Sequence, residues 1–377
     1  MFIKGVGMTK FGISEDTSSH LAYESVLEAL DDARLSMNDV DAIVVSSIEV
    51  MSNGERQKHS GSMISSLFKK KVPILSVPAG CAGGGTALWT AIKLGKSEDY
   101  RNILAVGFDK IISNTSKKVI DELLMGGERI YEQTEGLVFP AQNALVAQQY
   151  MLKYGATTDD FALVAFKNHK NAFLNPKARF YKKKISLEDI KSSPIVASPL
   201  RVFDCSISCN GSAAVIISKE EGDIELAGSA EVNDYLCPFE RDDMISLEST
   251  GIAADIAYKE AGITPMDIGI AEVHDAFTPL ELISYEDLGF CSKGEGASLI
   301  REGATNLDGR LPVNTSGGLK AKGHPISPTG ISQIYEIAKQ MRGKAGERQI
   351  KKPKYGLAHN LGGVGSMATV HILKNLN

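Results

Sequence analysis

The chain has 377 residues, 43% hydrophobic and 23% charged, a composition typical of a folded globular protein long enough for two domains or two fused half-domains. Its formal net charge of −5 argues against a nucleic-acid-binding protein, and no run of about 18 apolar residues predicts a membrane-spanning helix. The five cysteines are an odd number and no Cys–His set has zinc spacing, so we expect a reducing, cytoplasmic setting and no metal site.

Strand and helix signals alternate along the first third of the chain. Residues 2–8, 41–46 and 102–108 are apolar runs that predict strands, whereas residues 19–34 have the spacing of an amphipathic helix. The first run is too short and too rich in glycine for a signal peptide. This alternation predicts an α/β fold, in which helices cover the faces of a sheet.

A cysteine stands at a turn between a strand and a helix. Residues 73–77 predict a short buried strand and residues 86–94 a helix that stops at Gly95, which places Cys81 near a helix N-terminus. Free backbone N–H groups and the helix dipole there favour a thiolate and an oxyanion, and the neighbouring glycines permit close approach. The alternative is a buried structural cysteine in a tight packing turn.

Residues from about 111 to 200 interrupt the alternation. Helices are predicted over 141–154 and 158–171, and a capping box at Ser186 and Asp189 opens a short third helix. A basic, aromatic run occupies residues 179–184. We expect this stretch to be an insertion over the active-site face, whose cations and rings hold the phosphates and adenine of a nucleotide-tailed substrate. An ordinary solvated surface is the alternative.

The chain contains an internal repeat. Residues 28–45 and 256–273 both read as a helix end, a polar turn, an aspartate and a hydrophobic strand. Asp39 matches Asp267, and the hydrophobic residues beside them match as well. Two copies of one unit predict a duplicated α/β half, although two helix–turn–strand units can also resemble each other by chance.

Three later polar clusters follow predicted strands or lie in glycine-rich loops. They are His274 with Asp275, the run 314–325 that contains Ser316 and His324, and the run 359–365 that contains His359, Asn360 and Gly362. Ligand sites in α/β sheets gather at strand ends. A thiol nucleophile needs a base and an oxyanion hole from elsewhere in the fold, so we expect these clusters to converge on Cys81.

These motifs carry a family resemblance. The cysteine turn, the His-Asp-x-Phe sequence at 274–277, the Gly-His-Pro sequence at 323–325 and the final glycine-rich loop occur in the order of the thiolase superfamily. The middle segments 167–172, 199–205 and 210–214 resemble thiolases of the sterol-carrier-protein-2 type and their archaeal relatives. The resemblance covers nearly the whole chain.

The resemblance implies the thiolase fold, with duplicated βαβαβαββ halves in a five-layer αβαβα sandwich. The halves would be residues 1–222, with the loop domain inserted at about 111–200, and residues 223–377. It implies Cys81 as the acyl-carrying nucleophile, His324 as its base, His274 at the water-positioning place, and the backbone N–H groups of Cys81 and Gly362 as the oxyanion hole. Coenzyme A contacts are expected from Arg179, Tyr181, Lys182, Lys183 and Ser316.

The sequence departs from the family pattern at the second catalytic cysteine. The two places where relatives carry it hold His359-Asn360 and Ala276, and neither is a thiol. A Claisen condensation needs a base for the methyl proton of the second acetyl thioester. We hypothesise that His359 or His324 is this base, because a neutral imidazole suits the role. The alternative is a chain that has lost the chemistry and only binds acyl-CoA.

The implied activity is that of an acetyl-CoA C-acetyltransferase, which joins two acetyl-CoA molecules through an acetyl-cysteine and feeds the mevalonate route. The implied substrates are coenzyme A thioesters, with no permanently bound cofactor. A homodimer or homotetramer is expected, and a complex with 3-hydroxy-3-methylglutaryl-CoA synthase and a zinc-ribbon/OB-fold protein is plausible. Degradative thiolysis of longer 3-oxoacyl-CoA and a non-catalytic scaffold stay open. A 3-hydroxy-3-methylglutaryl-CoA synthase would need a carboxylate base, which no motif marks.

Overall fold

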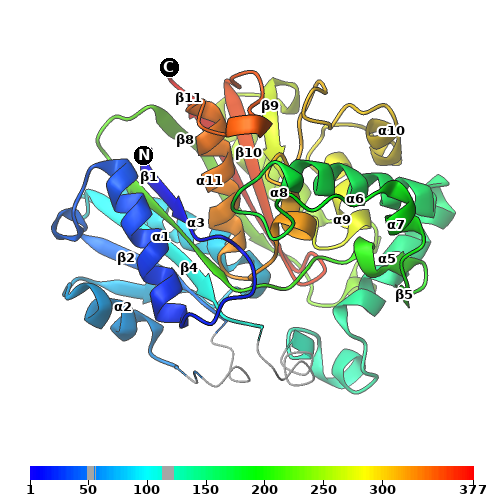
Figure 1. Cartoon of the computed structure of the whole chain (residues 1–377), viewed down its shortest axis with the longest axis horizontal. Helices are drawn as coiled ribbons and strands as arrows, with labels where there is room; N and C mark the ends of the chain where they lie inside the picture. The colour runs from blue at the N-terminus through cyan, green and yellow to red at the C-terminus, as the bar shows by residue number, and fades with distance from the viewer. Residues whose placement is uncertain (49–54, 56, 113–122) are drawn as a thin grey trace.

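A large mixed sheet forms the centre of the molecule (Figure 1). The computed structural model describes residues 1–48, 55, 57–112 and 123–377. Within them the strands are ordered β3-β2-β4-β7-β1-β8-β11-β10-β9. The bounds are β1 Phe2–Met8, β2 Ala42–Ser46, β3 Ile74–Ser76, β4 Asn102–Asp109, β7 Gly211–Ser218, β8 Ile224–Asn233, β9 Ile268–Glu272, β10 Tyr355–Gly362 and β11 Met367–Asn375.

The two halves of this sheet have the same connectivity. In the first half β1 and β4 both pair antiparallel with β7, and β4 pairs parallel with β2. In the second half β8 and β10 pair antiparallel with β11, and β10 pairs parallel with β9. The halves meet where β1 pairs with β8, at Phe2 and Glu225. The predicted duplication is therefore present in the strand pairing itself.

The repeated sequence unit has the same structure in both halves. Helices α1 Ser18–Ala33 and α8 Glu248–Ala261 each lead through a short 3-10 turn into β2 or β9. In the first turn the Asp39 carboxylate accepts the Ser36 backbone N–H at 2.8 Å, and in the second the Asp267 carboxylate accepts the Thr264 N–H at 2.8 Å. The matched aspartates thus cap equivalent turns, a local device that the repeat in the sequence predicts.

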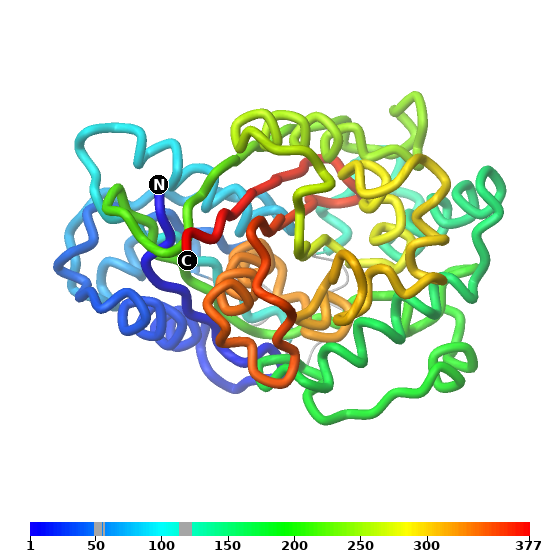
Figure 2. Tube along the Cα trace, turned by 90° about the horizontal axis from the view of Figure 1, so that it is seen from above, coloured from blue at the N-terminus to red at the C-terminus, as the bar shows by residue number. Residues whose placement is uncertain are grey.

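Helices form three layers around the two half-sheets. Helices α1 and α2 Ser60–Phe68 cover the first half, and α8 lies along the outer side of β8 and β11 (Figure 2). Helices α3 Gly83–Gly95 and α11 Thr329–Met341 lie between the halves and contact strands of both. This is the five-layer αβαβα sandwich that the family resemblance implied.

The two central helices touch each other at their N-terminal ends through glycine. A Cβ added to Gly84 would lie 2.6 Å from the Ser327 carbonyl oxygen and 2.8 Å from the Gly330 nitrogen. Real Cβ atoms do not approach backbone so closely, so this contact requires glycine. Cys81 directly precedes α3 and His324 lies shortly before α11, so the contact brings the two residues to the same place.

The inserted region packs beside the second half. It contains α5 Phe139–Tyr154, α6 Thr158–Phe173, α7 Leu187–Lys191 and the hairpin of β5 Ile195–Ala197 with β6 Leu200–Arg201. The predicted capping box is present, because the Asp189 carboxylate accepts the Ser186 N–H at 2.9 Å. Helix α5 contacts α9 Thr278–Asp287, and α6 contacts both α9 and α10 Gly296–Arg301. No helix among the described residues is long and apolar enough to cross a membrane.

Two strand predictions need correction. β3 was expected to be buried, but it is an edge strand, and Leu75 and Ser76 are exposed because no further strand covers that side among the described residues. Residues 359–362 were expected in the final glycine-rich loop, but the pairing of β10 with β11 continues to Gly362. His359, Asn360 and Gly362 therefore lie within a strand rather than in a loop, which decides where their side chains point.

Candidate active site

Cys81 lies in the 3-10 turn Gly80–Ala82, immediately before α3. Its carbonyl oxygen accepts a hydrogen bond from Asn360 Nδ2 at 2.9 Å. The Oδ1 atom of the same amide accepts the Gly85 N–H at 3.2 Å, so Asn360 holds both the turn and the first turn of α3 against β10. The position of Cys81 is thereby set by a strand from the opposite half of the molecule.

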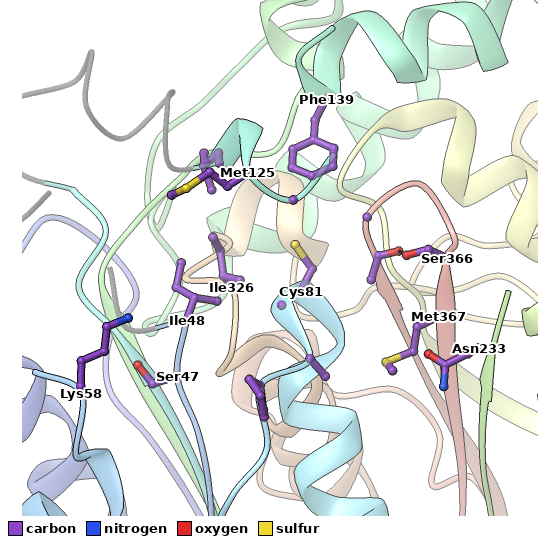
Figure 3. A pocket seen from close by; sticks show the side chains of 17 residues that line it. Ser47, Ile48, Lys58, Cys81, Met125, Phe139, Asn233, Ile326, Ser366 and Met367 are labelled. Atoms are coloured by element: carbon purple, nitrogen blue, oxygen red, sulfur yellow. Dashed lines mark hydrogen bonds between the residues drawn. The ribbon is translucent and has the colours of Figure 1, made fainter. Parts of the chain in front are cut away.

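Two cavities meet at Cys81. The larger has a volume of about 620 Å³ and is shown in Figure 3, where the Cys81 sulfur points toward Phe139 and Met125. The smaller, of about 340 Å³, is lined by Cys81, His274 and His324. Leu123 and Phe139 belong to the walls of both, so the inserted region lies over the cysteine as the sequence predicted.

Two imidazoles face each other beside the cysteine. His274 follows β9, His324 lies in the loop before α11, and their ring centroids are 5.4 Å apart with the planes nearly perpendicular. Asn360 Nδ2 donates to His274 Nδ1 at 2.9 Å, and the Thr329 hydroxyl lies 2.8 Å from His324 Nδ1. Among the described residues His274 Nε2 has no hydrogen-bond partner. Because Nδ1 is an acceptor, Nε2 carries the ring proton and is a donor available to a ligand.

Both imidazoles are neutral in this structure. Burial lowers the pKa of His324 to about 3, and the Lys322 ammonium lowers it further in the same direction. Burial lowers the pKa of His274 well below its usual value, and the imidazoles of His324 and His359 lower it in the same direction. A neutral imidazole accepts a proton, so His324 is available as a base at physiological pH.

The Cys81 thiol is protonated in the free protein. Burial raises its pKa to about 12, and the nearby Asp109 carboxylate adds to this rise, whereas the backbone N–H of Gly363 donates to the sulfur and lowers the pKa. The expectation that the helix end favours a thiolate is therefore wrong for the free state. Desolvation outweighs the N-terminal field of α3, and the thiol requires a base.

Asp109 is a site residue that the sequence analysis missed. It ends β4, and its carboxylate accepts from the Ser47 hydroxyl at 2.9 Å, the Ile48 N–H at 2.9 Å and the Ser327 N–H at 2.8 Å. Burial raises its pKa to about 7. Asp109 thereby holds the loop before α11 against the first half-sheet. Its place directly after the strand predicted at 102–108 is the sequence feature that could have identified it.

A glycine turn supplies a backbone N–H to the Cys81 sulfur, whereas the oxyanion hole expected at Cys81 and Gly362 concerns a thioester oxygen and stays a prediction. The N–H that reaches the Cys81 sulfur belongs to Gly363, which has a φ of +55° and begins the turn between β10 and β11. Gly362 is still part of the strand, although it lines the larger cavity. The backbone therefore offers an N–H to the reacting sulfur from this turn.

His359 does not face the cysteine. Its Nε2 atom lies 2.9 Å from the Thr250 hydroxyl of α8, and its side chain is fully buried. Side chains alternate along a strand, so His359 points away from the face on which Asn360 contacts Cys81. His359 lines neither of the two cavities at Cys81. The hypothesis that it is the condensation base is wrong, and His324 is the candidate that lies in the site.

Replacing His359 with glutamine should therefore leave turnover within about threefold of the wild type, because only a buried hydrogen bond to Thr250 changes. The loss of stability should be about 1 kcal/mol, the usual net value of one such bond. Steady-state kinetics and chemical denaturation measure the two effects. A drop of 100-fold in kcat for a folded variant would return His359 to the catalytic group.

The expected coenzyme A contacts lie outside both cavities. Arg179 donates its backbone N–H to the Lys322 carbonyl at 2.8 Å, so the basic run lies along the outside of the segment before His324. Lys182 pairs with Glu347 at 3.2 Å beside the half-buried Tyr181. Lys183 lines a separate cavity of about 400 Å³.

Ser316 is misplaced as a coenzyme A contact. It is fully buried, and its hydroxyl donates to the carboxylate of Glu272 while accepting the Gly318 N–H at 3.2 Å. Both hydrogen-bonding roles are taken within the fold, so Ser316 offers no surface to a ligand. It instead stabilises the segment that leads to His324.

Two family models and several named relatives match most of this chain. Residues 1–221 match the family model described as "Thiolase, N-terminal domain", and residues 230–375 match "Thiolase C-terminal domain-like". An "Acetyl-CoA acetyltransferase" of Methanothermobacter thermautotrophicus is 38% identical over 98% of this chain and 97% of its own length. "Sterol carrier protein 2" of Homo sapiens is 32% identical over 99% of this chain and 72% of its own length.

Solved structures show the same architecture. The structure of an "Ltp2-ChsH2(DUF35) aldolase" superposes with a TM-score of 0.84 at 28% identity, covering 99% of this chain and 97% of that chain. The structure of human mitochondrial 3-ketoacyl-CoA thiolase has a TM-score of 0.76 at 16% identity, covering 100% of this chain and 98% of that chain, and is informative for the fold alone.

Proposed function

This chain belongs to the thiolase family and is an acyltransferase, and from that premise we propose that it is an acetyl-CoA C-acetyltransferase that condenses two acetyl-CoA molecules to acetoacetyl-CoA and coenzyme A. The observation that carries the proposal is the convergence of the Cys81 thiol and two neutral imidazoles on a single cavity. Cys81 would carry the acetyl group between the two half-reactions.

The first half-reaction follows from the local geometry. The free Nε2 side of His324 takes the Cys81 proton while Thr329 holds Nδ1, and the thiolate attacks the thioester carbonyl. The backbone N–H groups of Gly363 and Cys81 contact the sulfur and would stabilise its thiolate. Coenzyme A then leaves, and the acetyl group stays on the sulfur.

In the second half-reaction a second acetyl-CoA presents its methyl group to the acetyl-Cys81. The Nε2–H of His274 is positioned to donate to the thioester oxygen, because Asn360 occupies the opposite ring nitrogen. This hydrogen bond would stabilise the enolate that forms when the methyl proton is removed.

The proposal is tested by mixing the purified protein with acetyl-CoA. We expect an acetyl adduct at Cys81 by intact mass and peptide mapping, and formation of acetoacetyl-CoA by chromatography. Bound acetyl-CoA without an adduct or product would favour the scaffold alternative instead.

A second candidate is thiolysis of longer 3-oxoacyl-CoA. The smaller cavity carries apolar walls from Leu124, Val138, Val196 and Phe277, which is more apolar surface than an acetyl group covers. Comparing kcat/KM for 3-oxoacyl-CoA of increasing chain length separates the two, since acetoacetyl-CoA should be the best substrate of an acetyltransferase.

The compartment, pathway and partners that we propose are those implied by the family resemblance. We place the reaction in the cytoplasm, at the entry to the mevalonate route, in a homodimer or homotetramer. The related Ltp2-ChsH2(DUF35) aldolase has a second component, ChsH2(DUF35), beside Ltp2, which supports the proposal of a small protein partner here. A complex that also includes 3-hydroxy-3-methylglutaryl-CoA synthase is the form we propose.

A further inference from the structure

A second cysteine lines the cavity that contains Cys81. Cys205 directly follows the 3-10 turn Val202–Asp204 and shares the 340 Å³ cavity with Cys81, His274 and His324. The sequence shows alanine at position 276, where sterol-carrier-type relatives are expected to carry a second thiol. In the fold, residues 205–206 run antiparallel to 276–277, and the Ser206 N–H donates to the Ala276 carbonyl at 2.7 Å. The Cys205 thiol therefore stands on the wall next to Ala276.

The backbone around Cys205 is held firmly. The Asp204 carboxylate accepts from the Thr278 hydroxyl at 2.8 Å and from the Arg201 N–H at 2.8 Å. The buried ammonium of Lys320 donates to the Asp204 carbonyl at 2.6 Å. The thiol itself is half-buried and lies 3.5 Å from the Arg201 carbonyl oxygen. A group fixed in this way can meet a substrate in one geometry.

Charged groups act on both thiols. Burial raises the pKa of Cys205 to about 11, the Lys320 ammonium lowers it, and the Asp204 carboxylate raises it. At Cys81 the neighbouring charged carboxylate, Asp109, raises the pKa. A buried cation beside a thiol is the arrangement that stabilises a thiolate. The unpartnered Nε2 of His274 belongs to the same cavity and supplies a donor for the carbonyl of a bound thioester.

We propose that Cys205 is the second acid/base of the reaction, acting in the cavity that it shares with Cys81; this assignment rests on the proposed function. In the first half-reaction Cys81 gives its proton to His324, and Cys205 gives its proton to the departing coenzyme A thiolate. The enzyme then holds an acetyl group on Cys81, an imidazolium at His324 and a thiolate at Cys205.

In the second half-reaction the Cys205 thiolate removes a proton from the methyl group of the incoming acetyl-CoA. The electron pair of that C–H bond forms the new C–C bond to the acetyl carbon, and the bond from that carbon to the Cys81 sulfur breaks. His324 returns its proton to Cys81, so both thiols and the neutral imidazole are restored. No oxidant or further reactant is needed.

The test uses Cys205→Ala and the near-isosteric Cys205→Ser, with Cys291→Ser as the matched control. Cys291 is also half-buried but lines a different cavity with Glu295 and Arg310. Condensation should fall about 10²- to 10⁴-fold in both Cys205 variants, the usual range for loss of a general acid/base. Incorporation of deuterium from D2O into the acetyl-CoA methyl group should be lost.

Acylation by an activated acetyl thioester separates this role from a structural one. The p-nitrothiophenolate leaving group departs without a proton. The acetyl thioester of p-nitrothiophenol should therefore acetylate Cys81 in the Cys205 variants at nearly the wild-type rate. Thermal melting checks that both variants fold. Condensation and deuterium exchange within twofold of the wild type would overturn the role of Cys205 and leave the proposed function standing. A wild-type protein that takes no acetyl group would overturn both.

Discussion

Replacing Cys81 with serine is expected to eliminate the acetyl adduct and to lower kcat/KM by about 10³-fold or more, the scale seen when a covalent nucleophile is removed. The serine hydroxyl is nearly isosteric, so Asn360 can still hold the turn through the backbone carbonyl at residue 81. A hydroxyl is a far weaker acid than a thiol, and the adjacent Asp109 carboxylate disfavours any anion at this place. Intact mass after mixing with acetyl-CoA, together with steady-state thiolysis, measures both effects.

The control for this variant is Cys291→Ser, which should keep full activity because Cys291 lies in another cavity. Binding of acetoacetyl-CoA by the Cys81→Ser protein should stay within about threefold of the wild type, since the cavity walls are unchanged. If the serine variant still forms the adduct, another side chain carries the acyl group and the assignment of Cys81 fails.

Local patterns were sufficient to predict the α/β class and the duplication, whereas the five-layer arrangement was implied by the family resemblance. Helix periodicity, strand runs and capping residues such as Asp39 and Asp267 act over a few positions, so they can be read from one sequence. The matched units also indicated the duplication, because equivalent turns are capped by equivalent aspartates. The glycines around Cys81 indicated close packing, and the contact of Gly84 with Gly330 is where that packing occurs.

The direction in which a side chain points was harder to predict. β10 extends to Gly362, into the run that was expected to be a glycine-rich loop, and the alternation of a strand then places His359 and Asn360 on opposite faces. A loop at the same positions would have allowed both side chains to reach Cys81. The raised pKa of Cys81 could not be predicted from the sequence either. Desolvation of the thiol depends on Leu123 and Phe139, which the inserted region contributes to the cavity walls.

A long-range partner explains the error at Ser316. Its hydroxyl is occupied by Glu272, which is 44 residues earlier in the chain. Pairing of this kind leaves no signal in the spacing of either residue. Cys205 was missed for a related reason. Its place in the site comes from pairing with the distant 276–277 segment, and its own sequence context does not indicate that pairing.

Replacing His324 with glutamine is expected to slow acetylation of Cys81 by about 10²- to 10⁴-fold, because the protonated thiol loses its base. Glutamine can still reach Thr329, so the loop before α11 should remain in place. Thr329→Val is the matched control, since it leaves the imidazole present and should cost much less.

The pH dependence of the wild-type enzyme supplies an independent test of His324. A histidine whose pKa lies near 3 stays neutral as the pH falls from 8 to 5, and a thiol whose pKa lies near 12 stays protonated over the same range. The reactive pair is then present throughout, so kcat/KM for acetylation should not fall between pH 8 and 5. The neighbouring Asp109 changes charge in this range, because burial raises its pKa to about 7; its protonation removes a charge that raises the pKa of Cys81 and so does not slow the reaction. A histidine with the ordinary pKa of about 6.5 would instead lose its base form below that value, and the rate would fall about tenfold for each further pH unit. Stopped-flow acetylation across this range distinguishes the two profiles, and a fall centred near pH 6.5 would show that the site is open to water when it reacts.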